Sequence, residues 1–199
     1  MKISSDYRLT SNNYYEEVSD KHQIVVGHSY NSGMAHYNSW VNRMNGLNKK
    51  TTPYTITLSG VIHEHFDPKY GCKFIDPLFD RYLIPITLEN EGWLIEQDGK
   101  FYDWLGRIYS REEPPIKIEW RGKFLWAPYS NKQIESTIEL VRALCETFEI
   151  PRKVIGDCTQ KVRPIEFNGV TYKSNYYKEY LDLSPAFDYL SFRYGIEKN

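Results

Sequence analysis

Short apolar runs along the chain predict the strands of a sheet. Residues 24–26, Ile-Val-Val, form a continuous β-branched run that favours a buried strand. Residues 54–66 read as two strand-like arms around Ser59-Gly60, which predicts a hairpin. A third apolar run lies within 82–94. Pro85 inside this run favours an edge position or a bulge, because proline cannot donate a hydrogen bond to a strand ladder.

Helical spacing of apolar residues predicts two amphipathic helices, a short one within 31–45 and a long one over 131–149. Ser130 is the expected N-cap of the long helix, and Gln133 would complete a capping box. The apolar stripe of this helix comprises Ile134, Ile138, Val141, Leu144, Cys145 and Phe148. We therefore expect the long helix to pack on the sheet, with Cys145 in the core.

A short strand at 153–156 and a C-terminal helix within 183–192 complete the pattern. Strands that alternate with helices predict an α/β fold with a mixed central sheet flanked by helices. We expect an N-terminal arm over 1–21 and a single domain over 22–199. An aromatic-rich insertion, interpreted as loop, interrupts this domain at about 93–129.

Composition and charge exclude several function classes. The 199 residues carry a net charge of −1, from 25 basic and 26 acidic residues, which gives no electrostatic case for nucleic acid or an anionic membrane. The three cysteines are far apart and odd in number, which argues against a disulfide framework. The N-terminus lacks the apolar core of a signal peptide, and no apolar run approaches the ~20 residues that span a bilayer. We expect a soluble protein that is made in a cytoplasm.

Five segments in order resemble one enzyme family. They are "IVVGHS", "PYTITLSGVIHEHFD", "IPITLENEG", the long helix followed by "IPRKVIGDCT", and "YLDLSPAFDYLSF". This series is similar to the zinc-dependent N-acetylmuramoyl-L-alanine amidases, the amidase-2 or peptidoglycan-recognition-protein fold, which includes amidase-type phage lysozymes. The resemblance covers the chain from about Ile24 to Phe192. It implies the family's fold and a peptidoglycan ligand.

The resemblance also implies a zinc site, at which the chain departs from the family. Two histidines and a third ligand hold zinc in these enzymes, and the metal activates a water molecule. The first histidine position is Gly27 here, with His28 one residue later. The second histidine position is Asp157, and the third ligand is retained as Asp182.

The proton-handling residues of the family differ as well. The family glutamate falls on Thr87, with Glu89 nearby, and the family lysine falls on Tyr180. Tyr54 stands where phage-type enzymes place a catalytic tyrosine. Tyr54 and Glu89 are therefore the candidate catalytic residues, and the resemblance places Thr87 and Tyr180 among the candidate ligand contacts.

The residues leave several metal chemistries open. Gly27, Asp157 and Asp182 offer two carboxylates and no imidazole, which is a poor zinc site. Two carboxylates with water could hold Mg²⁺ or Ca²⁺ weakly, or could bind no metal. A local bulge could instead bring in His28 to complete a His-Asp-Asp site. Cys158 could substitute if the register slipped, although a small buried residue is the favoured interpretation.

Two further features have competing interpretations. His63 and His65 would share a strand face with Asp67, which suits a metal but is more simply a solvated hairpin face. The insertion with Trp93 has three interpretations: a small core under a long loop, a partner surface, or a wall on which glycans stack. We rank the small core first and include Trp93 among the candidate ligand contacts.

The favoured hypothesis is an amidase-fold module that has lost zinc catalysis, needs no cofactor, and binds peptidoglycan or other protein chains of an assembly. The resemblance to phage-type members suggests a virion or tail component. The alternative is an active N-acetylmuramoyl-L-alanine amidase. It would hold zinc with His28, Asp157 and Asp182, and Glu89 or Tyr54 would carry the proton.

Overall fold

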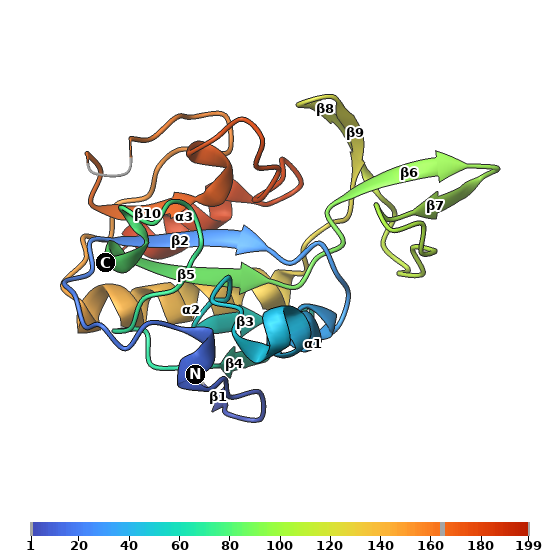
Figure 1. The fold of residues 1–199 in the computed structure, drawn as a ribbon. Coiled ribbons are helices and arrows are strands. Elements are labelled where there is room, and N and C mark those ends of the chain that lie inside the picture. Colours follow the sequence, from blue (N-terminus) through green and yellow to red (C-terminus); the bar gives the residue numbers. More distant parts are fainter. Residues whose placement is uncertain (1, 164–165, 199) are drawn as a thin grey trace.

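The computed structural model describes residues 2–163 and 166–198, and its main sheet has six strands in the order β1-β4-β3-β5-β2-β10 (Figure 1). Strands β3, β5, β2 and β10 run parallel, whereas β4 pairs antiparallel with β3. This is the mixed central sheet that the sequence predicts. The strands span Ile3–Ser4 (β1), Gln23–His28 (β2), Tyr54–Ile56 (β3), Ile62–Glu64 (β4), Leu83–Leu88 (β5) and Gly169–Tyr172 (β10).

Among the residues that the structure describes, the α-helices are α1 (Ala35–Asn42), α2 (Asn131–Thr147) and α3 (Tyr189–Glu197). Short 3-10 helices in the same ranges occupy Ser11–Asn13, Arg43–Gly46, Asp80–Tyr82 and Lys173–Asn175. The backbone N–H of Gln133 donates to Ser130 Oγ at 3.1 Å, which confirms the predicted N-cap of α2. The Gln133 side chain does not close the predicted capping box. It donates instead to the carbonyls of Ile56 and Glu89, which ties α2 to the sheet.

The two faces of the main sheet have different coverings. Ile24 and Val26 of β2 belong to the large core that α2 and α3 cover. Val25, between them, packs with Phe74 and Leu83 on the opposite face, because successive side chains of a strand alternate in direction. None of the helices in the described ranges combines the length and the apolar character needed to cross a bilayer.

The N-terminal arm covers the hairpin, so the prediction of a solvated hairpin face is wrong. Strand β1 pairs with β4, and His63 and His65 are both buried. His65 Nδ1 lies 2.6 Å from the carbonyl oxygen of Tyr7, and its Nε2 lies 2.8 Å from Thr55 Oγ1. These contacts give His65 a structural role.

Pro85 lies inside the sheet, not at an edge. It faces Val25 on β2, but the ladder between β5 and β3 begins only at Ile86. The missing N–H group of proline is therefore tolerated one residue before that ladder starts.

The insertion forms a second sheet, which corrects the interpretation as loop. Strands β6 (Trp93–Gln97), β7 (Lys100–Tyr102), β8 (Ile116–Trp120) and β9 (Lys123–Trp126) pair antiparallel in the order β7-β6-β9-β8. Figure 1 shows this sheet extending away from the main sheet. Leu94 and Trp126 are buried, but many of its apolar side chains are exposed: Ile95, Trp104, Leu105, Ile108, Ile118 and Phe124. The insertion therefore has little core of its own.

Candidate functional site: a cleft beside Gly27

A cleft of about 420 Å³ opens on the Gly27 side of the main sheet. Residues from distant parts of the chain line it. They include Tyr30, Trp40, Arg43, Lys50, Thr52, Phe74, Thr87, Trp104, Lys173, Glu179, Tyr180 and Asp182. The cleft therefore combines aromatic walls with charges of both signs, a composition that suits a polar organic ligand.

Gly27 leaves room for other side chains at the floor of the cleft. A Cβ atom built on Gly27 would lie 2.6 Å from Asp182 Oδ2 and 3.2 Å from Phe74 Cζ. The Lys173 side chain would lie 3.4 Å away. The absence of a side chain at Gly27 is thus what allows these three residues to converge.

Asp182 is buried at this position, and its two oxygens have protein partners. Its Oδ1 accepts a hydrogen bond from the Tyr30 hydroxyl at 3.2 Å. Its Oδ2 accepts the backbone N–H of His28 at 3.4 Å and lies 3.6 Å from Lys173 Nζ. Burial, followed by the charge of Asp182, raises the pKa of Tyr30 well above its ordinary value, so Tyr30 remains a neutral donor.

Lys173 supplies a buried positive charge to the cleft. It follows β10, and its side chain is only 11% exposed. Its Nζ lies 4.6 Å from the ring centroid of Phe74 and 4.8 Å from that of Tyr180, two cation–π contacts. The ammonium group is therefore held by a carboxylate and two aromatic rings. Sequence reasoning missed Lys173, because its place in the cleft depends on where β10 ends and that strand is defined by its pairing with β2.

His28 borders the cleft beside Tyr30, but its imidazole bonds Tyr129 and does not take the position of a side chain on Gly27. Strand β2 pairs with β5 without interruption through His28 and Leu88, so no bulge rotates the imidazole. Its Nδ1 lies 2.7 Å from the hydroxyl of Tyr129, a member of the core cluster. Burial lowers the pKa of His28 to about 4, so the ring is neutral near pH 7.

The Asp157 carboxylate bonds residues of its own loop. Its Oδ1 accepts hydrogen bonds from the backbone N–H of Thr159 at 2.7 Å and from the Thr159 hydroxyl at 2.6 Å. This arrangement is an Asx-type turn that uses the carboxylate locally. The predicted set of His28, Asp157 and Asp182 is therefore not assembled.

The side chains of the two candidate catalytic residues, Tyr54 and Glu89, are used for packing and for backbone hydrogen bonds. Tyr54 packs in the core cluster with Ile56, on the face opposite to Thr55, and burial raises its pKa. The Glu89 carboxylate accepts backbone N–H groups from Gly33 and, at 3.0 Å, from Leu58. Glu89 thus joins two loops, and its two oxygens are already hydrogen-bonded.

Two of the three candidate ligand contacts line the cleft. Thr87 and Tyr180 do so, whereas Trp93 lies in the second sheet opposite Trp126, with Lys123 Nζ 3.5 Å from its ring centroid. The insertion reaches the cleft through Trp104 instead, whose Nε1 donates to the Tyr30 carbonyl at 2.9 Å.

Arg121, at the turn between β8 and β9, binds the backbone of residues 174–180, a segment that ends at the cleft residue Tyr180. Its guanidinium donates to the carbonyls of Ser174 at 2.9 Å and Tyr177 at 3.1 Å, and also to that of Tyr180. The second sheet therefore holds the segment that follows Lys173 and leads to Tyr180.

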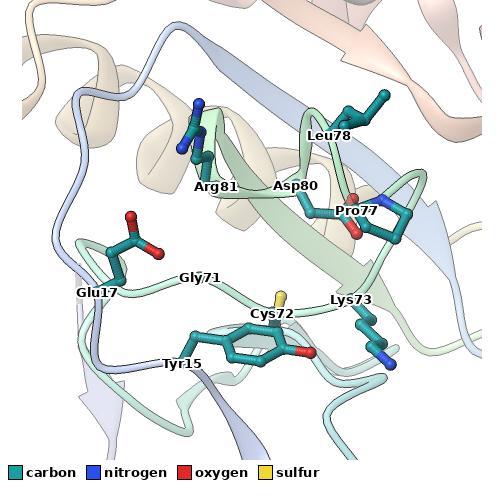
Figure 2. A pocket seen from close by; sticks show the side chains of 9 residues that line it. All are labelled: Tyr15, Glu17, Gly71, Cys72, Lys73, Pro77, Leu78, Asp80 and Arg81. Atoms are coloured by element: carbon teal, nitrogen blue, oxygen red, sulfur yellow. The ribbon is translucent and has the colours of Figure 1, made fainter.

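A separate pocket of about 330 Å³ lies between the N-terminal arm and residues 71–81 (Figure 2). Its Asp80 carboxylate accepts the backbone N–H groups of Phe74 at 3.0 Å, Ile75 at 2.7 Å and Asp76 at 3.0 Å. This loop structure positions Phe74 for its contact with Lys173. Cys72 also lines the pocket, and burial raises the pKa of its thiol, which keeps it protonated.

Comparison with solved structures identifies the fold. The structure of LysC, an N-acetylmuramoyl-L-alanine amidase from Clostridium intestinale URNW, matches with a TM-score of 0.55 at 13% identity, over 97% of this chain and 95% of that chain. A mutant of PlyL matches over 100% of both chains, with a TM-score of 0.59 at 9% identity. Drosophila peptidoglycan recognition protein SD matches with a TM-score of 0.52 at 8% identity, over 94% and 90%.

The chain has the N-acetylmuramoyl-L-alanine amidase fold. The fold indicated by the five sequence segments is thus confirmed. No protein-family model and no curated protein sequence matches the chain. A fold alone does not imply a function, so the chemistry of the cleft decides which function this chain supports.

The cleft residues do not fit the zinc site that this amidase fold commonly carries. Gly27 has no donor atom, and the imidazole of His28 bonds Tyr129 in the core. Asp182 is already bonded, and the Lys173 ammonium beside it would repel a divalent cation. Within residues 2–163 and 166–198, no three His, Cys, Asp or Glu side chains converge as metal ligands.

Proposed function

We propose that the chain is a peptidoglycan-binding module of the amidase fold that does not use zinc hydrolysis. The observation that carries this proposal is the convergence of Gly27, Asp182 and Lys173 at the position where the resemblance expects a metal. A protein cation replaces the ligand set there, while a cleft of about 420 Å³ is retained.

The cleft chemistry supports recognition of a muramyl peptide. Trp40 and Trp104 offer apolar faces on which a sugar ring can stack, and Trp104 is 47% exposed. Hydroxyl and charged groups of the floor, such as Thr87 and Lys173, can bind the polar atoms of a peptide. The names of the structural neighbours point to the same ligand class.

The alternative function is an active N-acetylmuramoyl-L-alanine amidase. It is favoured by the names of LysC and of LysCS, an endolysin amidase. This function would require a cleft rearrangement that brings His28, Asp157 and Asp182 together.

One experiment separates the two functions. Purified protein is incubated with peptidoglycan and with soluble muramyl peptides, with added zinc or with a chelator, and both binding and released amines are measured. The binding module retains sedimentable peptidoglycan binding and releases no amines in either condition. Chelator-sensitive release of amines would instead establish the amidase and refute the proposal.

We also propose, from the resemblance to phage-type amidases and the endolysin among the neighbours, that the module belongs to a phage virion or tail. Mass spectrometry of purified particles tests this location. We expect the protein to be detected in the particles in a fixed ratio to the other virion proteins. Finding the protein only in the soluble lysate would contradict the proposal.

A further inference from the structure

The ammonium group of Lys173 stands where a metal-dependent enzyme of this fold is expected to hold its metal. It lies 3.6 Å from Asp182 Oδ2, a separation longer than a direct hydrogen bond. It also lies over the faces of Phe74 and Tyr180, which attract a cation but accept no strong hydrogen bond. Lys173 therefore has donor capacity left for a ligand oxygen.

A second cation, Lys50, lines the same cleft. Burial, followed by the positive charge of Lys173, lowers the pKa of Lys50, whereas the charge of Asp182 acts in the opposite direction. In the described parts of the chain, no carboxylate lies within ion-pair distance of Lys50 or of its cleft neighbour Arg43. A bound anion would relieve this repulsion.

The acidic residues that line the cleft, Asp182 and Glu179, are fewer than its cations, which are Arg43, Lys50 and Lys173. Asp182 is engaged by Tyr30, by the backbone of His28 and by Lys173. Glu179 is exposed on the cleft rim and has no ion pair within the described ranges. The floor of the cleft thus favours a negatively charged group over a metal cation.

We propose that Lys173 replaces the metal as the resident cation of this cleft and that Lys173 and Lys50 together bind a carboxylate of the ligand. This inference rests on the proposed function, because it names the part of a muramyl peptide that the cleft recognises. The carboxylate of the peptide lies against the two ammonium groups, and the sugar lies toward the tryptophans.

Binding of two matched probes tests the inference by calorimetry. The probes are muramyl dipeptide, which carries one free carboxylate, and its neutral amide. The carboxylate form is expected to bind at least about tenfold more tightly, because hydrogen bonds to charged groups are stronger than neutral ones. Lys50→Met is expected to remove most of this preference, and Lys132→Met, an exposed lysine on α2, is the matched control.

Lys173 needs a variant that keeps the protein folded. Lys173→Met alone would leave Asp182 buried without its cation, so the double variant Lys173→Met/Asp182→Asn is used, with its folding checked by circular dichroism. Loss of the carboxylate preference in this variant and in Lys50→Met supports the inference. Equal binding of both probes to the natural protein would overturn the inference and leave the proposed function standing, whereas binding of neither probe would overturn both.

Discussion

The two faces of strand β2 place neighbouring residues in different environments. Val26 packs in the large core cluster, and His28 bonds Tyr129 of that cluster at the border of the cleft. Gly27, between them, faces the cleft, where Asp182 and Lys173 fill the space beside its backbone. Apolar packing determines the structure of the core face. On the cleft face, the structure depends on the absence of a side chain at Gly27 and on the ion pair between Asp182 and Lys173.

The difference shows why a one-residue shift decides the chemistry of this site. A strand turns each successive side chain to the opposite face, so an imidazole at His28 cannot serve the position of Gly27 unless the strand bulges. The unbroken ladder between β2 and β5 excludes such a bulge in this structure. Changes on the core face should therefore alter stability alone, and changes on the cleft face should alter both stability and ligand binding.

The largest expected effect is on the cleft face, at Asp182. Asp182→Ala leaves the Lys173 ammonium buried without a carboxylate, which we expect to lower the free energy of unfolding by about 3–5 kcal/mol. Urea denaturation measures this change. The double variant Lys173→Met/Asp182→Asn should recover most of the loss. A double variant as unstable as Asp182→Ala would show that the pair is not the cause.

On the core face, Ile24→Ala should lower the free energy of unfolding by about 2–5 kcal/mol, because Ile24 is fully buried in the large cluster. Ligand affinity, measured by calorimetry well below the denaturation midpoint, should remain unchanged. A loss of affinity comparable to that of a cleft variant would remove the distinction between the two faces.

Gly27→Ala tests the close contact on the cleft face. The new methyl group would lie 2.6 Å from Asp182 Oδ2, so the carboxylate has to move, at a cost of about 1–3 kcal/mol in unfolding free energy. We expect weaker muramyl dipeptide binding as well. Gly27→His should not create a zinc site, since Phe74 and Lys173 occupy the space; tight zinc binding by this variant would contradict that view.

The pH dependence of stability gives the smallest effect. Burial lowers the pKa of His28 from 6.5 to about 4, so the unfolded chain binds a proton that the folded chain does not bind between these values. Stability should therefore fall as the pH decreases from about 6.5 to 4, by on the order of 1 kcal/mol per such histidine at about pH 5.5. Burial also lowers the pKa of His65 to about 4, so it contributes in the same direction.

His28→Asn, which keeps an acceptor for Tyr129, should reduce this pH dependence without abolishing it. Thermal denaturation at several pH values measures the difference. An unchanged slope in His28→Asn would mean that His28 is accessible to protons in the folded protein, contrary to its burial.

Local patterns in the sequence predict the regular parts of the fold well. The helix over 131–149 is found as α2, because its apolar period and its Ser130 cap agree with each other. The buried strand at 24–26 is found as the centre of β2. In both segments local propensity and burial favour the same structure.

The second sheet and β10 could not be predicted in the same way. In the second sheet only Leu94 and Trp126 among the apolar strand residues are fully buried, and the others are half-buried or exposed, so hydrophobic alternation gives little signal for β6 to β9. Strand β10 has four residues and is defined by its pairing with β2. Non-local pairing, which a single sequence does not display, decides both regions.

The candidate site was only partly predictable, for a related reason. Asp182 and Gly27 are brought together as the resemblance implied. The partner of Asp182 is Lys173, however, and that contact depends on where β10 ends. Tyr54, Glu89 and Asp157 carry groups that could transfer protons or bind a metal. In the structure, Tyr54 packs in the core, and the carboxylates of Glu89 and Asp157 accept backbone hydrogen bonds.

The most direct test of a cleft with a protein cation in place of a metal is the zinc content of the purified protein. The protein is equilibrated with excess zinc, desalted and analysed for bound metal, with Asp182→Asn as a matched sample. Zinc far below one ion per chain in both samples, with no cleavage of muramyl peptides, is the predicted result. Close to one zinc ion per chain, lost in Asp182→Asn and accompanied by cleavage, would contradict it.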